Sequence, residues 1–120
     1  MGNYVIAAVA DIFFAAKIRA TAEHLELDVR FAKSVEAVIE ATREELPLLI
    51  IADLHNEKCN PFKLAEQLKA DEELRGVTLL GFFSHVQTAL QQQAAQAGFD
   101  RIMPRSAFSK HLPEILGRKS

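Results

Sequence analysis

Two patterns of apolar residues alternate along the chain. Short continuous runs predict strands that are buried on both faces of a sheet, and stretches with an apolar residue every three or four positions predict amphipathic helices. The runs predict strands over 4–10, 28–32, 48–52, 77–83 and 102–103, and the helical spacing predicts helices over 12–25, 61–68, 86–97 and 108–116, with another beginning after Ser34. Five strands alternating with five helices predict an α/β fold with a doubly wound parallel sheet, right-handed crossovers and helices on both faces.

Proline and glycine indicate where several helices begin or end. Pro61 is tolerated at the first position of its helix, and Gly98 suits the left-handed conformation that ends the helix before it. Pro113 falls within or just beyond the first turn of the last helix if Ser109 is its N-cap, whereas it would kink a helix that starts at Ser106. We therefore expect a short last helix.

The composition is that of a globular protein. The 120 residues are 49% hydrophobic and 25% charged, which predicts one domain over 1–120. A net charge of −2 without a basic block argues against nucleic-acid binding, and no apolar stretch approaches the roughly 20 residues that cross a bilayer. The N-terminus lacks a basic signal-peptide region, and the one cysteine, Cys59, fits a small semi-buried residue without a disulfide. We expect a cytoplasmic protein.

The strand over 48–52 ends on a carboxylate, Asp53. Because burial of an unpaired charge is costly, we expect Asp53 at the carboxyl edge of the sheet, where open parallel sheets place their ligand sites. From there the chain reads Asp53-Leu54-His55, later Ala97-Gly98, and Arg105 follows seven residues after that glycine. These landmarks resemble the receiver domain of bacterial response regulators over essentially the whole chain. The resemblance implies the flavodoxin-like (CheY-like) fold, with strand order 2-1-3-4-5.

The resemblance also implies a phosphorylation site. Asp53 matches the aspartate that takes a phosphoryl group from a histidine kinase or phosphotransfer protein. The ion that assists this transfer is Mg²⁺, which prefers oxygen ligands, and here Asp11, Asp53 and the backbone carbonyl of His55 would hold it. Arg105 stands at the family's lysine position and would contact the phosphoryl oxygens together with Ser84.

The strand-four hydroxyl of the family has two candidate positions in this chain. Ungapped counting back from Gly98 places Phe83 there, and one residue of slack brings in Ser84, which we prefer because it carries a hydroxyl.

Several positions depart from the family pattern. Ala10 replaces one of two acidic residues after the first strand, Ile102 replaces the aromatic switch residue, and Arg105 is bulkier than lysine. Two hypotheses follow. The first is a stand-alone receiver-like signalling module, not an enzyme, that is phosphorylated on Asp53 and contacts a downstream protein partner. The second is a phosphorylation-independent pseudo-receiver, a protein-binding scaffold whose pocket is locked by Arg105 and Phe13 or Phe14.

The same residues also have structural interpretations. Asp11 is as well suited to cap the following helix as to bind a metal, and Arg105 can form a permanent salt bridge with Asp53 or Asp11. A third hypothesis, a small zinc-dependent hydrolase using His55, His85 and Asp53, has no recognised zinc motif behind it. An apolar patch on the last strand and helix is a candidate homodimer surface.

Overall fold

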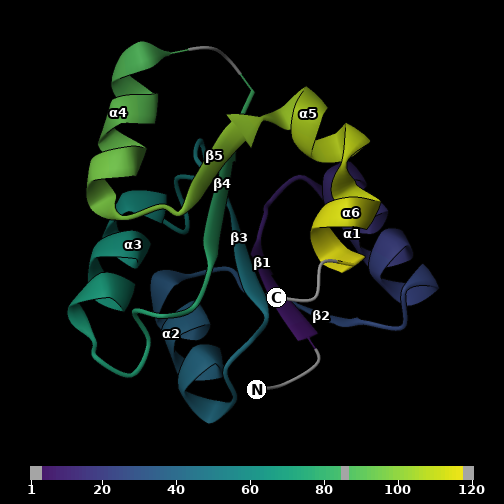
Figure 1. Cartoon of the computed structure of the whole chain (residues 1–120), viewed down its shortest axis with the longest axis horizontal. Helices are drawn as coiled ribbons and strands as arrows, with labels where there is room; N and C mark the ends of the chain where they lie inside the picture. Colours follow the sequence, from purple (N-terminus) through teal and green to yellow (C-terminus); the bar gives the residue numbers. More distant parts are fainter. Residues whose placement is uncertain (1–3, 85–86, 118–120) are drawn as a thin grey trace.

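A five-stranded parallel sheet forms the centre of the molecule (Figure 1). The structure, a computed structural model, describes residues 4–84 and 87–117; His85 of the zinc hypothesis and Val86, the first residue of a predicted helix, lie outside them. The strands are β1 (Tyr4–Ala8), β2 (Asp28–Phe31), β3 (Leu49–Asp53), β4 (Leu79–Phe83) and β5 (Arg101–Pro104). Their order is β2-β1-β3-β4-β5, which confirms the predicted doubly wound sheet.

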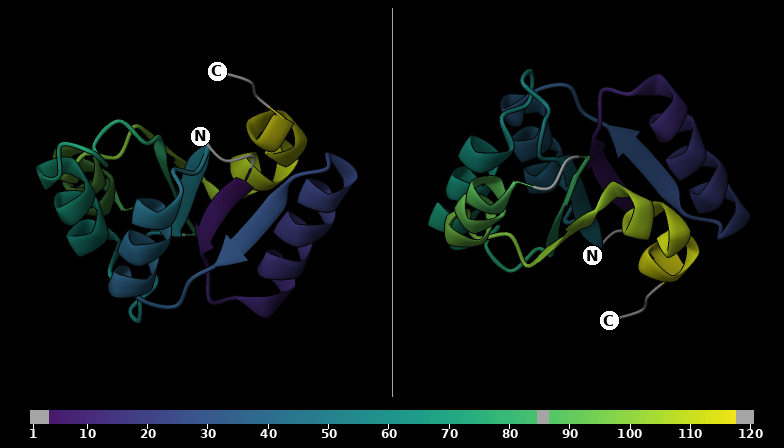
Figure 2. Two further views of the ribbon diagram at one scale, coloured as in Figure 1. Left: turned by 90° about the horizontal axis from the view of Figure 1, so that it is seen from below. Right: turned by 90° about the horizontal axis from the view of Figure 1, so that it is seen from above.

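Helices cover both faces of this sheet, as the two turned views show (Figure 2). The helices are α1 (Ile12–His24), α2 (Val35–Glu44), α3 (Pro61–Ala70), α4 (Thr88–Ala97), α5 (Arg105–Lys110) and α6 (Leu112–Gly117). One buried cluster joins the sheet to α2, α3 and α4, and a second joins it to α1, α5 and α6. Neighbouring residues of β1 divide between them: Ile6 belongs to the first cluster and Val5 to the second, because successive side chains of a strand point to opposite faces.

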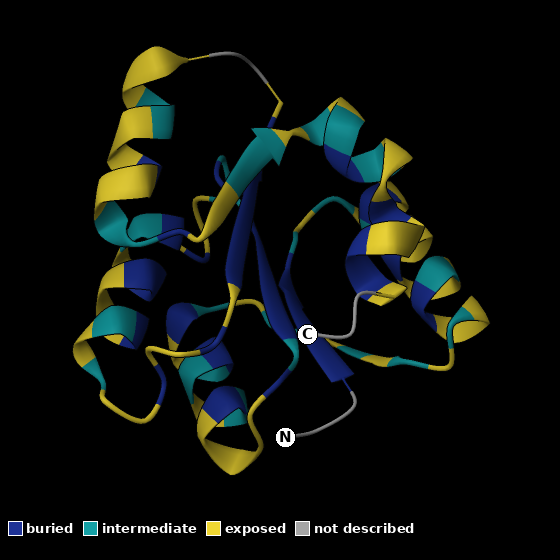
Figure 3. Ribbon diagram, viewed as in Figure 1, coloured by how far each residue is buried: buried dark blue, intermediate teal, exposed yellow. Residues whose placement is uncertain are grey.

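Burial differs between the three central strands and the two edge strands (Figure 3). Every residue of β1 and β4 is buried, and β3 is buried up to its last residue, Asp53. The edge strands β2 and β5 contain only exposed and half-buried residues. A strand covered on both faces reads as a continuous apolar run, and an edge strand carries a weaker signal.

Three predicted strands are longer than the observed ones, and one of them, β2, ends at Phe31 rather than at residue 32. β1 ends at Ala8 rather than at residue 10, and β4 begins at Leu79 rather than at Val77. The amide of Val77 donates to the carbonyl of Leu74 at 3.1 Å, so this buried apolar residue belongs to a turn before the strand. An apolar run marks burial, and it does not by itself distinguish a strand residue from a buried side chain in a turn.

The last helix is short, as predicted, but Ser109 does not cap it. Helix α5 already begins at Arg105, with Pro104 as its N-cap, and a second helix, α6, begins at Leu112. Between them, the amide of His111 donates to the carbonyl of Ala107. Pro113 has no amide hydrogen to continue the series, and the helical segment therefore divides just before it.

Two predicted helix termini are confirmed. Pro61 occupies the first turn of α3, after Asn60, whose side chain accepts hydrogen bonds from two amides. Gly98 follows α4 with φ 115°, a left-handed conformation that glycine adopts without strain. Among the described residues, no helix combines the length and the apolar character that crossing a membrane requires.

Candidate functional site

The carboxyl edge of the sheet gathers the residues that the sequence singled out. Asp11 follows β1 and precedes α1, Asp53 is the last residue of β3, Ser84 follows β4, and Arg105 is the first residue of α5 after β5. Because all strands are parallel, their carboxyl ends meet at one edge. Residues up to 94 positions apart in the sequence thereby come into contact.

The two carboxylate oxygens of Asp11 accept hydrogen bonds from different partners. Oδ1 caps α1, accepting hydrogen bonds from the amides of Phe13 at 2.9 Å and Phe14 at 3.1 Å. Oδ2 accepts a hydrogen bond from Nη2 of Arg105 at 2.8 Å. The Arg105 guanidinium, with the two helix amides, holds the pKa of this carboxyl below its usual value of 3.8. Of the two salt-bridge partners proposed for Arg105, the structure shows Asp11.

Arg105 also rests on an aromatic cluster. Its guanidinium carbon lies 4.4 Å from the centroid of the Phe14 ring, a cation–π arrangement. Phe14 in turn packs against Phe82 and Phe108, with ring centroids 5.0 and 5.5 Å away, and the Phe82 and Phe108 rings are stacked at 5.1 Å. Phe13 is 83% exposed, so Phe14 and not its neighbour lies beneath Arg105.

Asp53 is half-buried at the end of β3. Its Oδ1 accepts a hydrogen bond from the amide of His55 at 2.9 Å, which closes a local turn after the strand. Among residues 4–84 and 87–117, no cation lies within ion-pair distance of Asp53. Asp53 and Asp11 therefore share an edge of the sheet but differ in their partners.

Asn56 is a positioning residue that the sequence analysis missed. Its Nδ2 donates to the backbone carbonyl of Ala8 at 3.2 Å, which ties the loop after β3 to the end of β1. Its Oδ1 accepts hydrogen bonds from the amides of Lys58 and Cys59. Asparagine commonly stabilises turns in this way, so its place just after the strand was the available signal.

Several solved structures that resemble this chain are response regulators. A response regulator from Hahella chejuensis matches with a TM-score of 0.85 and 14% identity, over 99% of this chain and 100% of that chain. The chemotaxis response regulator CheY4 of Vibrio cholerae matches with a TM-score of 0.81 and 13% identity, over 97% of each chain. The chain has the fold of a response regulator receiver domain.

The receiver fold also relates this chain to the phosphorylated cyanobacterial phytochrome response regulator RcpA. That match has a TM-score of 0.80 and 13% identity, over 98% of this chain and 90% of that chain. The sequence itself matches no protein-family model and no curated protein. At these identities the likeness shows the fold, and it confirms the predicted flavodoxin-like, CheY-like class.

The residues at this edge of the receiver fold do not fit a magnesium ion well. Mg²⁺ takes oxygen ligands in a near-octahedral arrangement. Both oxygens of Asp11 already accept hydrogen bonds, one of them from a guanidinium, and Ala10 supplies no second carboxylate. Within the described part of the chain, no three acidic, histidine or cysteine side chains are grouped so as to hold a metal. At this edge Asp53 is a carboxylate with no cation within ion-pair distance among residues 4–84 and 87–117.

Cys59 is a core residue and not part of the site formed by Asp11, Asp53 and Arg105. It is 1% exposed, and burial, with a smaller contribution from Glu36, raises the pKa of its thiol to about 11. The thiol is therefore protonated at neutral pH and behaves as a small core residue.

A shallow hollow of about 510 Å³ beside Arg105 contains Ser84 as well. We call it the Arg105 hollow, and it is lined by Phe13, Phe14, Lys17, Ser84, Arg105, Ser106 and Ser109. Ser84 is exposed in it, whereas Phe83 is 5% exposed and belongs to the core. Of the two candidates for the strand-four position, only Ser84 can reach a ligand in this hollow.

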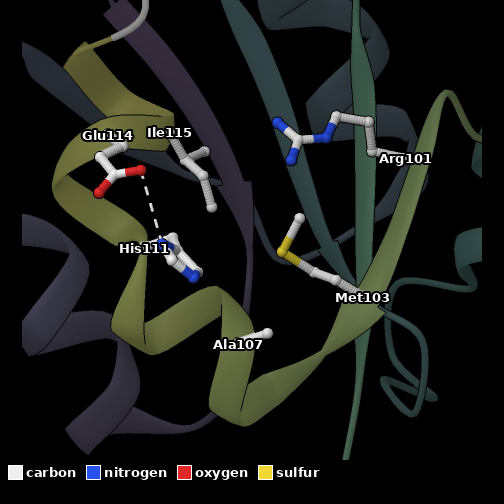
Figure 4. A pocket seen from close by; sticks show the side chains of 6 residues that line it. All are labelled: Arg101, Met103, Ala107, His111, Glu114 and Ile115. Carbon is white, nitrogen blue, oxygen red and sulfur yellow. Dashed lines mark ion pairs between the residues drawn. The ribbon is translucent and has the colours of Figure 1, made fainter.

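A separate hollow of about 490 Å³ lies between β5 and the last two helices (Figure 4). Arg101 and Met103 extend from the strand toward it, and Ala107, His111, Glu114 and Ile115 line it from the helices. His111 Nδ1 is 3.5 Å from Glu114 Oε2, so the surface carries charged as well as apolar groups. The homodimer expected on this surface stays a prediction.

Proposed function

We propose that this chain is a receiver-fold signalling module that binds protein partners in the cytoplasm without a phosphoryl group on Asp53. It is a scaffold rather than an enzyme. The observation that carries the proposal is the hydrogen bond of 2.8 Å between Arg105 and Asp11. Asp11 is the residue that the receiver resemblance assigns to magnesium, and here Arg105 is bound to it.

Two carboxylates, Asp11 and Asp53, lie at the carboxyl ends of β1 and β3. A receiver that takes phosphate needs a divalent cation to offset the charge of the incoming group and of the acceptor carboxylate. Here the cation next to the β1 carboxylate is Arg105, and it is held by Asp11 and by the Phe14 ring together. Recruiting Asp11 as a magnesium ligand requires that this pair separate, and Ala10 offers nothing in exchange.

Incubation with acetyl phosphate and Mg²⁺, followed by intact mass spectrometry, tests the proposal. We expect no phosphorylated product from the native chain. A double variant, Ala10→Asp with Arg105→Lys, supplies the second acid and the family's lysine, and it serves as the gain-of-function control. Phosphorylation of the native chain that disappears in Asp53→Asn contradicts the proposal.

The phosphorylated receiver is the second candidate, and one observation favours it. Asp53 is half-buried at the carboxyl edge with no cation within ion-pair distance among the described residues, and this supports a phosphoacceptor role for its carboxylate. In that case a histidine kinase or phosphotransfer protein supplies the phosphoryl group. The same mass measurement separates the two candidates.

A further inference from the structure

Helix α1 is apolar on more than one side. Phe14, Ile18 and Ala22 form its buried stripe against the sheet. Ile12 is nevertheless 75% exposed and Phe13 83% exposed, more than any other large hydrophobic residue in the described part of the chain. A helix of a globular protein normally exposes polar residues opposite its buried stripe. Adjacent exposed apolar residues of this size indicate a surface that another molecule covers.

Ile12 borders a groove at the carboxyl edge of β1, β2 and β3. This hollow, the Ile12 groove, has a volume of about 410 Å³ and lies between the start of α1, the segment after β2 and the loop after β3. Four of its lining residues are alanines: Ala10, Ala15, Ala16 and Ala32. Small side chains leave room for apolar groups of a partner. The groove shares no lining residue with the Arg105 hollow.

The charges that line the Ile12 groove are all positive. They are Arg19, Lys33 and Lys58, and no acidic residue lines the groove. Within residues 4–84 and 87–117 none of the three forms an ion pair, although other cations such as Arg105 do. Arg19 lies over the ring of Phe31, with its guanidinium carbon 4.9 Å from the centroid. On a chain of net charge −2, this is a local excess of positive charge around an apolar hollow.

We propose that the Ile12 groove binds an acidic amphipathic segment of a partner protein. Apolar side chains of that segment cover Ile12 and the alanines, and its carboxylates meet Arg19, Lys33 and Lys58. Complementary charges across an interface speed association and select the partner. This inference rests on the proposed scaffold function, and it names the surface and the chemistry of the partner.

Binding to designed peptides tests the inference on the full chain. The probe is a fluorescein-labelled helical peptide of about 18 residues, five turns, with leucine along one face and glutamate elsewhere. Two control peptides replace every glutamate by lysine or every leucine by glutamine. We expect saturable binding of the acidic amphipathic peptide in fluorescence anisotropy and at least about tenfold weaker binding of both controls.

Matched variants of the chain locate the binding surface. Ile12→Ser and Lys58→Glu are expected to weaken binding of the acidic peptide at least about tenfold. Leu46→Ser and Lys63→Glu change an exposed apolar residue and an exposed lysine outside the groove, and they should retain the native affinity. Unchanged unfolding curves show that each variant is folded.

Three results overturn the inference. They are equal weakening by the groove variants and their matched controls, equal binding of the acidic peptide without leucines, and self-association of the chain that Ile12→Ser abolishes. The last result assigns the groove to a second copy of the chain. None of the variants alters Asp11, Asp53 or Arg105. Failure of peptide binding to the Ile12 groove is therefore distinguishable from failure of the scaffold proposal, which phosphorylation of Asp53 would show.

Discussion

Phe13 and Phe14 are consecutive in sequence but opposite in environment, and this allows a controlled test of the structure. Phe14 is 5% exposed within the aromatic cluster under Arg105, and Phe13 is 83% exposed. Replacing either one by alanine changes helix propensity equally, so the difference between the two variants reports burial and contacts alone.

The magnitude follows from the surface that each ring buries. A phenylalanine buries about 150–250 Å², which at about 25 cal/mol per Å² corresponds to about 4–6 kcal/mol, less the part that alanine retains. Measured truncations of buried phenylalanine cost about 3–5 kcal/mol, and we expect Phe14→Ala to fall in that range. Phe13 has about a sixth of its surface covered, so Phe13→Ala should change the free energy of unfolding by less than about 0.5 kcal/mol.

Urea denaturation followed by circular dichroism measures both values. Since domains of this size are stable by about 5–15 kcal/mol, the loss in Phe14→Ala is a large part of the total and easily resolved. Equal losses in the two variants, or a loss below about 1.5 kcal/mol in Phe14→Ala, would refute the assignment of Phe14 to the core and to the support of Arg105.

Three further predictions concern single residues. Asp11→Asn keeps the helix cap but not the charge, so it should lower the urea midpoint at neutral pH. The folded pKa of Asp11 lies below 3.8, so its stabilisation is present above that pH and is lost as the pH falls through the folded pKa. The gap between variant and native chain should therefore narrow as the pH falls below 3.8, and a constant gap contradicts the ion pair. Cys59, with a pKa of about 11, should react with a disulfide reagent at about pH 8 far more slowly in the folded chain than in urea, and equal rates would show that it is accessible. Gly98→Ala should lower the free energy of unfolding by roughly 1–2 kcal/mol, because φ is 115° and the added Cβ would lie 2.6 Å from Cγ of Lys69. Gly76 has open space around it, so Gly76→Ala is the control and should change the free energy of unfolding little.

The core of the fold was predictable because burial leaves a periodic trace in the sequence. The continuous runs of β1, β3 and β4 arise from strands covered on both faces, and Phe14, Ile18 and Ala22 keep the helical spacing of a buried stripe. The register of Asp53, Gly98 and Arg105 then identified the receiver fold. These features depend on local pattern and on spacing along the chain.

The parts that the sequence left open depend on competition between neighbouring signals. Ser109 is a good capping residue, yet α5 starts four residues earlier because the chain is already helical from Arg105 onward. In the same way, Ile12, Phe13 and Phe14 are all apolar, and the sequence alone left open which phenylalanine faces Arg105. Which of Asp11 and Asp53 pairs with Arg105 depends on how far the side chains reach across the edge of the sheet, and spacing along the sequence does not give that distance.

The most direct test of whether Asp11 stays paired with Arg105 is a backbone NMR spectrum of the native chain with Mg²⁺ and beryllofluoride, a stable mimic of the phosphoryl group. We expect the amide resonances of Phe14, Leu54 and His55 to keep their positions, because Asp11 remains bound to Arg105. Saturable shifts of these resonances that vanish in Asp53→Asn would contradict it and show an open, metal-dependent acceptor site.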